Sequence, residues 1–315
     1  MDEYSNEKIP VIAVVGPTAS GKTALGVKLA KAFDGEVISA DSMQIYQGMD
    51  IASAKPTTEE MDGIPHHLID FQDPNQAFSV ADYTALAHKK ATEINRQGKR
   101  PVVVGGTGLY VDSFLENIQF PAIIVDENYK SKLEQQAEAG GGAFLLAKLT
   151  EVDPLLAAQL NAADTTRIIR GLTVYEATGK PLTFWKEESR KEPSPYEVIW
   201  FGLTAKDRSF LYSRIDQRVD LMMEQGLLEE ARQIWEEGAG KTASAAIGHK
   251  EFFLYFEQQI SLEEATEQVK QDTRRYAKRQ LTWFRKNPNI HWFYIDEESP
   301  EEIENHAKEL VGAKK

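Results

Sequence analysis

The residues best suited to chemistry in this chain form one short run, from Gly16 to Thr23. The run reads Gly-Pro-Thr-Ala-Ser-Gly-Lys-Thr and fits the phosphate-binding pattern G-x-x-x-x-G-K-[ST], called the P-loop. In this pattern backbone N–H groups converge on phosphate oxygens, the lysine adds a mobile positive charge, and the threonine hydroxyl can bind Mg²⁺. We therefore expect a di- or triphosphate group, with Mg²⁺ as cofactor, to be bound by Gly16, Pro17, Thr18, Ala19, Ser20, Gly21, Lys22 and Thr23.

Two further polar loops follow apolar runs of the kind that form buried strands. Asp41 follows one of these runs directly, and its carboxylate is suited to accept a proton, to hold Mg²⁺ through water or to cap a helix. Residues 105–108 follow another run and read Gly-Gly-Thr-Gly, which suits either a close approach of a ligand to the backbone or a tight turn. The residue types alone leave these alternatives open.

The hydrophobic pattern predicts a scaffold that would bring these loops together. Short apolar runs alternate with helical patterns, such as residues 22–33, 80–96 and 109–115. This alternation predicts an α/β fold, a P-loop NTPase-like parallel sheet flanked by helices, in which ligands bind beyond the carboxyl ends of the strands. The expected strands are residues 11–15, 36–40, 102–104, 198–203 and 291–295.

The middle of the chain has a different character. Residues 118–197 contain helical patterns rich in Glu, Gln and Ala, with helix-breaking signals at Asp153-Pro154 and at Gly179-Lys180-Pro181. No strand signal appears there before Val198. We therefore expect an all-helical insertion domain of residues 118–197 between the two halves of a core domain, residues 1–117 and 198–315.

Charge is distributed unevenly along the chain. The net charge of −13 argues against nucleic-acid binding over the whole surface. Between Lys270 and Lys286, however, seven residues are basic and only Asp272 is acidic. This basic face is either a solvated helix surface or a surface for phosphates. Pairs of arginines one helical turn apart, which suggest anion contacts, are Arg167 with Arg170 and Arg214 with Arg218.

Composition excludes several classes of site. The chain has no cysteine, which rules out disulfides, thiolate catalysis and cysteine-based zinc sites. His66 and His67 are adjacent, so in an extended segment they point to opposite faces, and we favour a structural role over a metal site. The polar start of the chain and the lack of a long apolar run lead us to expect a cytoplasmic protein without a membrane span.

Taken together, the motifs resemble those of bacterial tRNA dimethylallyltransferase, also called tRNA isopentenyltransferase, over nearly the whole chain. The many ordered blocks make this resemblance far more specific than a P-loop alone. The matching blocks are GPTASGKT at 16–23, DSMQIYQGMDIASAKP at 41–56, HHLID at 66–70, SVADY at 79–83, GGTGLY at 105–110, DPLLAAQL at 153–160, DTTRIIRGLTVYEATGKP at 164–181, RIDQRVDLMMEQGLLEEA at 214–231, IGHKE at 247–251 and TRRYAKRQLTWFRK at 273–286.

The resemblance implies transfer of a dimethylallyl group from its diphosphate to N6 of the adenosine beside the tRNA anticodon. It implies that the P-loop holds the diphosphate, with Mg²⁺ at Thr23, and that Lys22 and Arg218 stabilise its departure. It further implies that Asp41 is the general base and that Thr107 lies near the reacting nucleotide.

The resemblance also implies partners: dimethylallyl diphosphate and the anticodon arm of tRNA, bound by a monomer away from membranes. The helical insertion would clamp the arm together with the basic helix. The residues implied in tRNA binding are Asp41, Ser42, Met43, Gln44, Thr107, Lys130, Thr166, Arg167, Ile168, Ile169, Arg170, Ala245, Ala246, Ile247, Gly248, His249, Lys250, Arg274, Lys278 and Arg279.

Some positions depart from the family pattern. Ala245 and His249 stand where the family commonly has Gln and Tyr, and Ala52-Ser53 stands in place of Gly-Thr. Lys130 stands where an arginine is common, so a bidentate phosphate contact would become a contact with a point charge.

Three other functions are compatible with the P-loop. Relatives that prenylate free AMP, ADP or ATP lack the long helical insertion and the basic helix, so these two segments favour tRNA. A P-loop kinase of a small metabolite would leave the C-terminal basic block unexplained. A non-catalytic RNA-binding module would not need Lys22, Thr23 and Asp41 in this arrangement.

Overall fold

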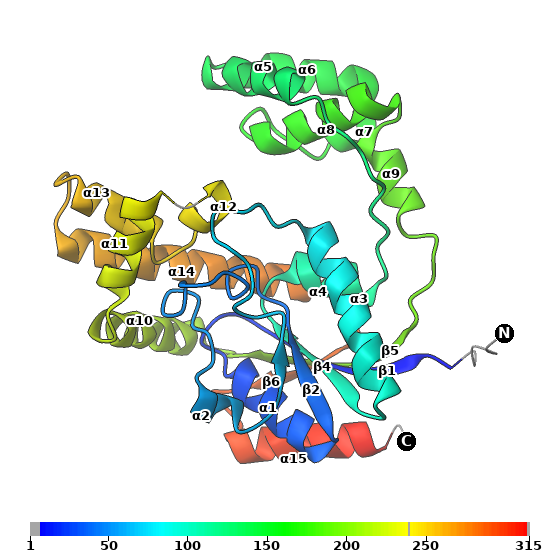
Figure 1. Cartoon of the computed structure of the whole chain (residues 1–315), viewed down its shortest axis with the longest axis vertical. Coiled ribbons are helices and arrows are strands. Elements are labelled where there is room, and N and C mark those ends of the chain that lie inside the picture. The colour runs from blue at the N-terminus through cyan, green and yellow to red at the C-terminus, as the bar shows by residue number, and fades with distance from the viewer. Residues whose placement is uncertain (1–6, 239, 314–315) are drawn as a thin grey trace. The chain divides into compact units, whose positions relative to one another are not determined.

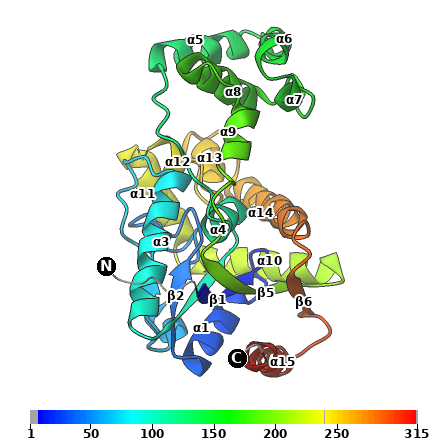
Figure 2. The ribbon, with the colours of Figure 1, turned by 90° about the vertical axis from the view of Figure 1, so that its right-hand side faces the viewer.

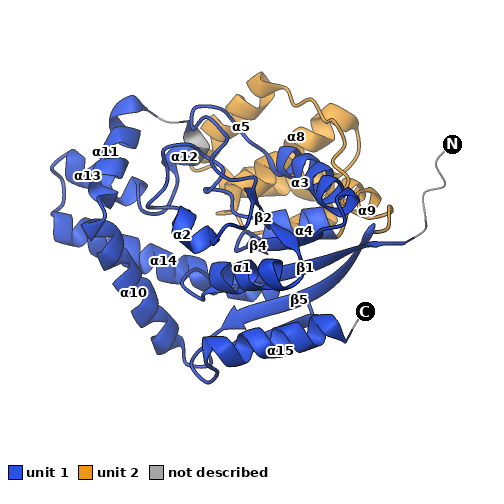
Figure 3. Ribbon diagram, turned by 60° about the horizontal axis from the view of Figure 1, so that its bottom comes forward, with its two compact units in different colours: residues 1–115, 194–315 blue, residues 116–193 orange. Residues whose placement is uncertain are grey.

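The computed structural model describes residues 7–238 and 240–313, which divide into two compact units. Unit 1 comprises Met1–Leu115 and Ser194–Lys315, and unit 2 comprises Glu116–Pro193 (Figure 3). The boundaries expected at 118 and 197 therefore move to 116 and 193. The second boundary moves because Tyr196 and Glu197 already pair with Ile9 and Pro10 in the sheet of unit 1.

Unit 1 is built on one parallel sheet of six strands, ordered β3-β2-β4-β1-β5-β6 (Figure 1). The strands are β1 (Ile9–Val15), β2 (Gly35–Ser39), β3 (His66–His67), β4 (Arg100–Gly105), β5 (Tyr196–Thr204) and β6 (Ile290–Tyr294). The predicted α/β fold is confirmed. The five expected strands are present with slightly different ends. The very short β3 was not predicted as a strand, because two residues are too few to show an alternating pattern.

Alternate residues of the central strand point to opposite faces of the sheet. Val11, Ala13 and Val15 of β1 pack with α3 (Val80–Arg96) and α4 (Gly108–Leu115). Ile12 and Val14 pack with α1 (Lys22–Ala32) and α15 (Pro300–Gly312) on the other face (Figure 2). Burial of each valine or isoleucine side chain among them contributes roughly 1.5–3 kcal/mol. This two-faced burial makes the sheet the rigid base of unit 1.

The other helices of unit 1 stand at the carboxyl edge of the sheet or beside it. They are α2 (Thr58–Met61), α10 (Arg208–Glu224), α11 (Leu227–Glu237), α12 (Lys241–Ser244), the 3₁₀ helix η1 (Lys250–Phe252), α13 (Phe253–Phe256) and α14 (Leu262–Phe284). The helix α14 begins with a capping box, in which Ser261 and Glu264 satisfy each other's backbone N–H groups. It packs against α10 through Leu211, Ile215, Ala277 and Leu281.

Unit 2 contains only helices among its elements: α5 (Glu127–Glu138), α6 (Gly142–Val152), α7 (Pro154–Ala157), α8 (Thr165–Thr178) and α9 (Leu182–Glu188). Its core is formed mainly by leucines and isoleucines of α5, α6 and α8, with Leu149 and Ile168 fully buried. The expected break at Asp153-Pro154 separates α6 from α7. There the buried Asp153 carboxylate accepts from the N–H of Leu156 and from Thr183.

Candidate active site

The P-loop, residues 16–23, connects β1 to α1 at the carboxyl edge of the sheet. Gly21 sits at the N-cap of α1 with φ of 87°, in the left-handed region that favours glycine, and has no side chain to cap the helix. A Cβ at Gly16 would lie 2.5 Å from the carbonyl oxygen of Leu203. The two glycines thus allow the loop to close over β5 and leave the first N–H groups of α1 available to an anion.

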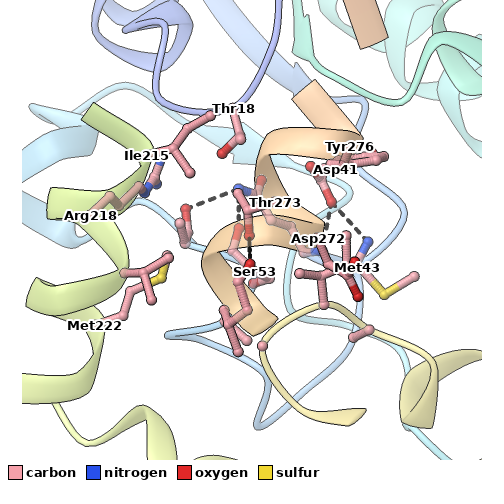
Figure 4. A pocket seen from close by; sticks show the side chains of 18 of the residues that line it. Thr18, Asp41, Met43, Ser53, Ile215, Arg218, Met222, Asp272, Thr273 and Tyr276 are labelled. Atoms are coloured by element: carbon pink, nitrogen blue, oxygen red, sulfur yellow. Dashed lines mark hydrogen bonds between the residues drawn. The ribbon is translucent and has the colours of Figure 1, made fainter. Parts of the chain in front are cut away.

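The P-loop opens onto a cavity of about 390 Å³ in unit 1 (Figure 4). Arg218 and Met222 of α10 line one side, and Tyr276 of α14 lies beside Asp41. The lining residues are Thr18, Lys22, Thr23, Asp41, Ser42, Met43, Gln44, Ala52, Ser53, Ala54, Ile215, Arg218, Val219, Met222, Ala245, Ala246, Ile247, Gly248, Lys250, Val269, Asp272, Thr273, Tyr276, Arg279 and Gln280. The structure thus brings together the P-loop, the Asp41 loop, the loop around residue 246 and the basic helix.

Lys22 lies half-buried in the wall of this cavity, and its Nζ donates to the carbonyl oxygen of Pro17 at 3.4 Å. Withdrawal from water lowers the pKa of Lys22 from 10.5 to about 8, although Asp41 acts in the opposite direction. The neighbouring positive charge of Arg218 also lowers it. An anion bound between Lys22 and Arg218 would reverse this shift, so the pair is arranged to hold negative charge.

Arg214 and Arg218 lie one turn apart on α10 but make different contacts. Arg218 faces the cavity, and burial lowers its pKa, which means that it is partly removed from water. Arg214 donates from Nε to the carbonyl oxygen of Ala19 at 3.0 Å, so it fixes the P-loop.

Asp41 combines the two roles that its sequence position suggested. Its Oδ1 accepts from the N–H groups of Met43 at 2.9 Å and Gln44 at 3.3 Å, and so caps the following turn. Among the described residues the Asp41 carboxylate forms no other hydrogen bond, so Oδ2 can act as an acceptor in the cavity. The carboxylate is therefore held in place by one oxygen while the other can take a proton.

Thr107 ties the Gly-Gly-Thr-Gly loop, residues 105–108, to the Asp41 loop. Its Oγ1 accepts from the N–H of Ser42 at 3.1 Å, and its own N–H donates to the carbonyl oxygen of Ala40 at 3.2 Å. The phenol of Tyr276 lies near Thr107 and Gln280, and burial, followed by the charge of Asp41, raises its pKa to about 12. Tyr276 therefore stays protonated and acts as a hydrogen-bonding group at neutral pH.

Residues 245–250 form part of the cavity wall, but they do not all face the cavity. Ala245, Ala246, Ile247, Gly248 and Lys250 line it. The sixth residue, His249, is fully buried, and its Nε2 lies 2.8 Å from Oε1 of Glu230. Sequence reasoning placed His249 among the tRNA-binding residues, whereas its side chain contacts Glu230 beneath the cavity wall.

Two residues that sequence reasoning missed hold the cavity walls. The buried carboxylate of Glu230 accepts from the N–H groups of Asp50, Ile51 and Ala52 at 2.7–2.9 Å as well as contacting His249. Gln280 links the P-loop to residue 106. The sequence around these two residues gives no signal of their roles, because their partners are distant in sequence.

The basic helix α14 carries cations of two kinds. Arg274 pairs with Asp216 at 2.5 Å and Glu267 at 2.7 Å. Lys278 and Arg279 are exposed and, within the described part of the chain, form no ion pair. The guanidinium of Arg279 lies 5.6 Å from the ring centre of Tyr276 and reaches the cavity. The free positive charge of α14 is thus concentrated near Lys278 and Arg279.

The expected tRNA-binding residues of unit 2 divide in the same way. Thr166, Arg167 and Arg170 are exposed on α8. Ile168 and Ile169, from the same run, are buried in the core of unit 2 and present no side chain to a partner. Lys130 of α5 pairs with Glu127 at 3.0 Å and remains accessible.

Comparisons with known proteins identify the family of this chain. The family model described as IPP transferase matches residues 44–287. The chain belongs to the IPP transferase family. A tRNA dimethylallyltransferase of Carboxydothermus hydrogenoformans is 47% identical over 93% of this chain and 94% of the relative. That of Bacillus subtilis is 46% identical over 97% and 96%.

Solved structures of the same family are also similar. The tRNA isopentenylpyrophosphate transferase of Bacillus halodurans shares 43% identity over 97% of this chain and 96% of that chain, with a TM-score of 0.72. A eukaryotic dimethylallyltransferase, solved while acting on tRNA, shares 30% identity over 91% of this chain and 74% of that chain, with a TM-score of 0.76.

The described residues contain neither a membrane-spanning helix nor a metal-binding cluster. None of their helices is both long and apolar enough to span a bilayer. No group of three or more His, Asp and Glu side chains among them is placed to hold a metal ion.

Proposed function

We propose that this member of the IPP transferase family transfers a dimethylallyl group from dimethylallyl diphosphate to N6 of the adenosine beside the anticodon of tRNA, releasing diphosphate. One observation carries the proposal: a single cavity joins the P-loop to Asp41, and Thr107 is hydrogen-bonded to Ser42 of the Asp41 loop. The groups that would bind the leaving diphosphate and the carboxylate that would accept a proton thus face the same cavity. Curated relatives that match nearly the whole chain are named tRNA dimethylallyltransferases.

The leaving-group side is built for negative charge. The first N–H groups of α1 and the side chains of Lys22 and Arg218 surround the position of a diphosphate. As the C1–O bond breaks, charge grows on the diphosphate oxygens. Fixed cations therefore stabilise the transition state more than the ground state. The apolar residues Ile215, Val219 and Met222 on α10 line the adjoining wall and suit a five-carbon prenyl chain.

Asp41 supplies the base on the nucleophile side. The lone pair of adenine N6 is delocalised into the ring, so N6 must lose a proton as it forms the bond to C1. The free oxygen of Asp41 accepts that proton, while Met43 and Gln44 hold the carboxylate in place. Thr107 fixes the Asp41 loop from the other side. The target adenosine has to leave its stack in the RNA to reach this cavity.

The residues fit Mg²⁺ as the cofactor. Mg²⁺ uses few protein ligands and completes its octahedral shell with phosphate oxygens and water, so a three-carboxylate cluster is not required. Thr23, in the first turn of α1, lines the cavity beside Lys22, and its hydroxyl is the group that would bind Mg²⁺. When bound, Mg²⁺ would neutralise part of the diphosphate charge.

The exposed cations suggest how tRNA is held. Lys278 and Arg279 on α14, with Arg167 and Arg170 on α8 and Lys130 on α5, would bind the phosphates of the anticodon arm. Arg274 contributes less, since its guanidinium is already paired with two carboxylates. We also propose that the enzyme is cytoplasmic, where its proposed substrate tRNA is found. We further propose that it acts as a monomer.

The runner-up functions predict different products. A small-metabolite kinase would consume ATP, and a free-nucleotide prenyltransferase would modify AMP. The test is incorporation of isotope from dimethylallyl diphosphate into unmodified tRNA, measured for the wild type and for Lys22→Ala. We expect label in tRNA, and a Lys22→Ala variant that binds dimethylallyl diphosphate much more weakly and tRNA nearly as well. ATP hydrolysis with no label in tRNA would reject the proposal.

A further inference from the structure

The amide of Gln280 occupies the space between two loops that serve opposite sides of the cavity. Its Oε1 accepts from the N–H of Thr18 in the P-loop at 2.9 Å, and its Nε2 donates to the carbonyl oxygen of Gly106 at 3.0 Å. The side chain is 5% exposed. Both ends of one buried amide are therefore satisfied by the backbones of two different loops.

We propose that Gln280 is a positioning residue for the transfer step: it holds the loop that binds the leaving diphosphate at a fixed distance from the loop that organises the attacking nucleotide. This inference rests on the proposed function. Gln280 would contact neither N6 of the adenosine nor C1 of the prenyl group, so we expect it to act through the two backbones that it joins.

The location of the two loops explains why a link is needed. The P-loop continues β1, and residues 105–108 continue β4, the neighbouring strand, where Val15 pairs with Gly105. Beyond that pair the strands end, and ladder hydrogen bonds no longer fix one loop against the other. Gln280 reaches them from α14 and replaces the missing ladder contacts.

The fit around Gln280 is close enough to be specific. A Cβ at Gly106 would lie 2.2 Å from Nε2 of Gln280, so glycine is required there for the amide to approach. A side chain with only an acceptor or only a donor could satisfy one loop and not the other. Loss of the amide would leave the N–H of Thr18 and the buried carbonyl of Gly106 without this partner.

The same link extends to the nucleophile side. Gly106, whose carbonyl oxygen accepts from Gln280, directly precedes Thr107 in the chain. Thr107 in turn holds the N–H of Ser42, next to Asp41. A chain of contacts therefore runs from the P-loop through Gln280 and residues 106–107 to the loop that carries the base.

This arrangement predicts an effect on turnover rather than on binding. The diphosphate is bound by the first turn of α1, Lys22 and Arg218, and the tRNA by exposed cations, and Gln280 supplies none of these contacts. Misplacing reacting atoms by about 1 Å can cost on the order of a hundredfold in rate. We therefore expect a large loss in kcat with small changes in both KM values.

The experiment compares three variants of the full-length chain in steady-state transfer from dimethylallyl diphosphate to tRNA. Gln280→Met keeps the length of the side chain and removes both hydrogen bonds. Gly106→Ala pushes the amide away while Gln280 is retained. Gln271→Met, at an exposed position on the same helix, is the matched control.

For Gln280→Met we expect kcat to fall by roughly tenfold to a hundredfold, with each KM within about threefold of the wild-type value. Gly106→Ala should lower kcat in the same way, and the double variant should be no worse than the poorer single variant, since both break one link. Gln271→Met should match the wild type. Thermal unfolding of each protein separates loss of fold from loss of turnover.

Several outcomes would overturn the inference. They are a wild-type kcat in Gln280→Met, a rise in KM with kcat unchanged, or losses that multiply in the double variant. If Gln280→Met does not fold, Gly106→Ala alone decides, because an unchanged kcat there would contradict the link. A wild-type enzyme that transfers no prenyl group to tRNA would instead refute the proposed function, so the two failures can be told apart.

Discussion

The lowered pKa of Lys22 predicts that the affinity for dimethylallyl diphosphate depends on pH in a range where an ordinary lysine would not titrate. Burial in the cavity wall brings the pKa of the free enzyme's Lys22 to about 8. Only the protonated form offers a positive charge to the diphosphate. Affinity should therefore be highest below this pKa and fall as pH rises through it.

The size of the effect follows from the fraction of Lys22 that is protonated. With a pKa of about 8, the Kd should rise about tenfold between pH 7 and pH 9, whereas a pKa of 10.5 would change it by only a few per cent. The ligand cannot cause this loss, because a terminal phosphate completes its ionisation near pH 6, and further ionisation would strengthen binding. Titration calorimetry with dimethylallyl diphosphate, without tRNA and at constant salt, measures the effect.

The matched control is Lys22→Arg, since a guanidinium stays charged throughout this range. Its Kd is expected to differ from that of the wild type at pH 7 but to stay flat up to pH 9. A wild-type Kd that stays constant from pH 7 to pH 9 would show that Lys22 does not titrate in this range. An equal rise of the Kd in Lys22→Arg would assign the titration to another group.

Three further predictions concern other parts of the molecule. Asp41→Asn keeps an oxygen to cap Met43, so the fold and tRNA affinity should persist while kcat falls on the order of a hundredfold or more; equal turnover would reject Asp41 as the base. Replacing Lys278 and Arg279 by Ala should weaken tRNA binding and reduce by about two the slope of log affinity against log salt concentration. Replacing the ion-paired Arg274 by Ala should change this slope little. Equal slopes in the wild type and the Lys278/Arg279 variant would show that α14 is not part of the RNA-binding surface. Glu230→Ala leaves three backbone N–H groups without their acceptor and should cost about 3 kcal/mol or more in unfolding free energy. Folding lowers the pKa of Glu230, so the stabilisation by its carboxylate is complete above the pKa of the unfolded state and is lost as pH falls through the pKa of the native state. The difference in Tm between the wild type and Glu230→Ala should therefore decrease in acid, and a constant difference would contradict this.

Features coded by neighbouring residues could be predicted from the sequence. The helix at residues 80–96 begins and ends where expected, because Ser79 and Asp82 form a capping box and Gly98 follows its last turn. The P-loop is likewise a local pattern whose flanking strand and helix were visible. The convergence of Asp41 and Thr107 followed from the rule that loops meet at the carboxyl ends of parallel strands.

Features that depend on tertiary contacts could not be predicted. Gln280 is 262 positions from Thr18, and nothing in its own neighbourhood indicates that its amide is buried between two loops. Glu230 anchors residues 50–52 from 178 or more positions away. The same limit explains why His249 and Ile168, chosen as parts of continuous motifs, turned out to be buried: a motif marks a segment, and the packing decides which side chains face outward.

The most direct test of the central claim is the mass and position of the product. The purified protein, with Mg²⁺ and dimethylallyl diphosphate, would be given unmodified tRNA and, separately, AMP and ATP, and nuclease fragments would be analysed by mass spectrometry. We expect a gain of one C5H8 unit on the adenosine beside the anticodon and no gain on the free nucleotides. A gain on AMP or ATP, or no gain on tRNA with the protein folded, would contradict it.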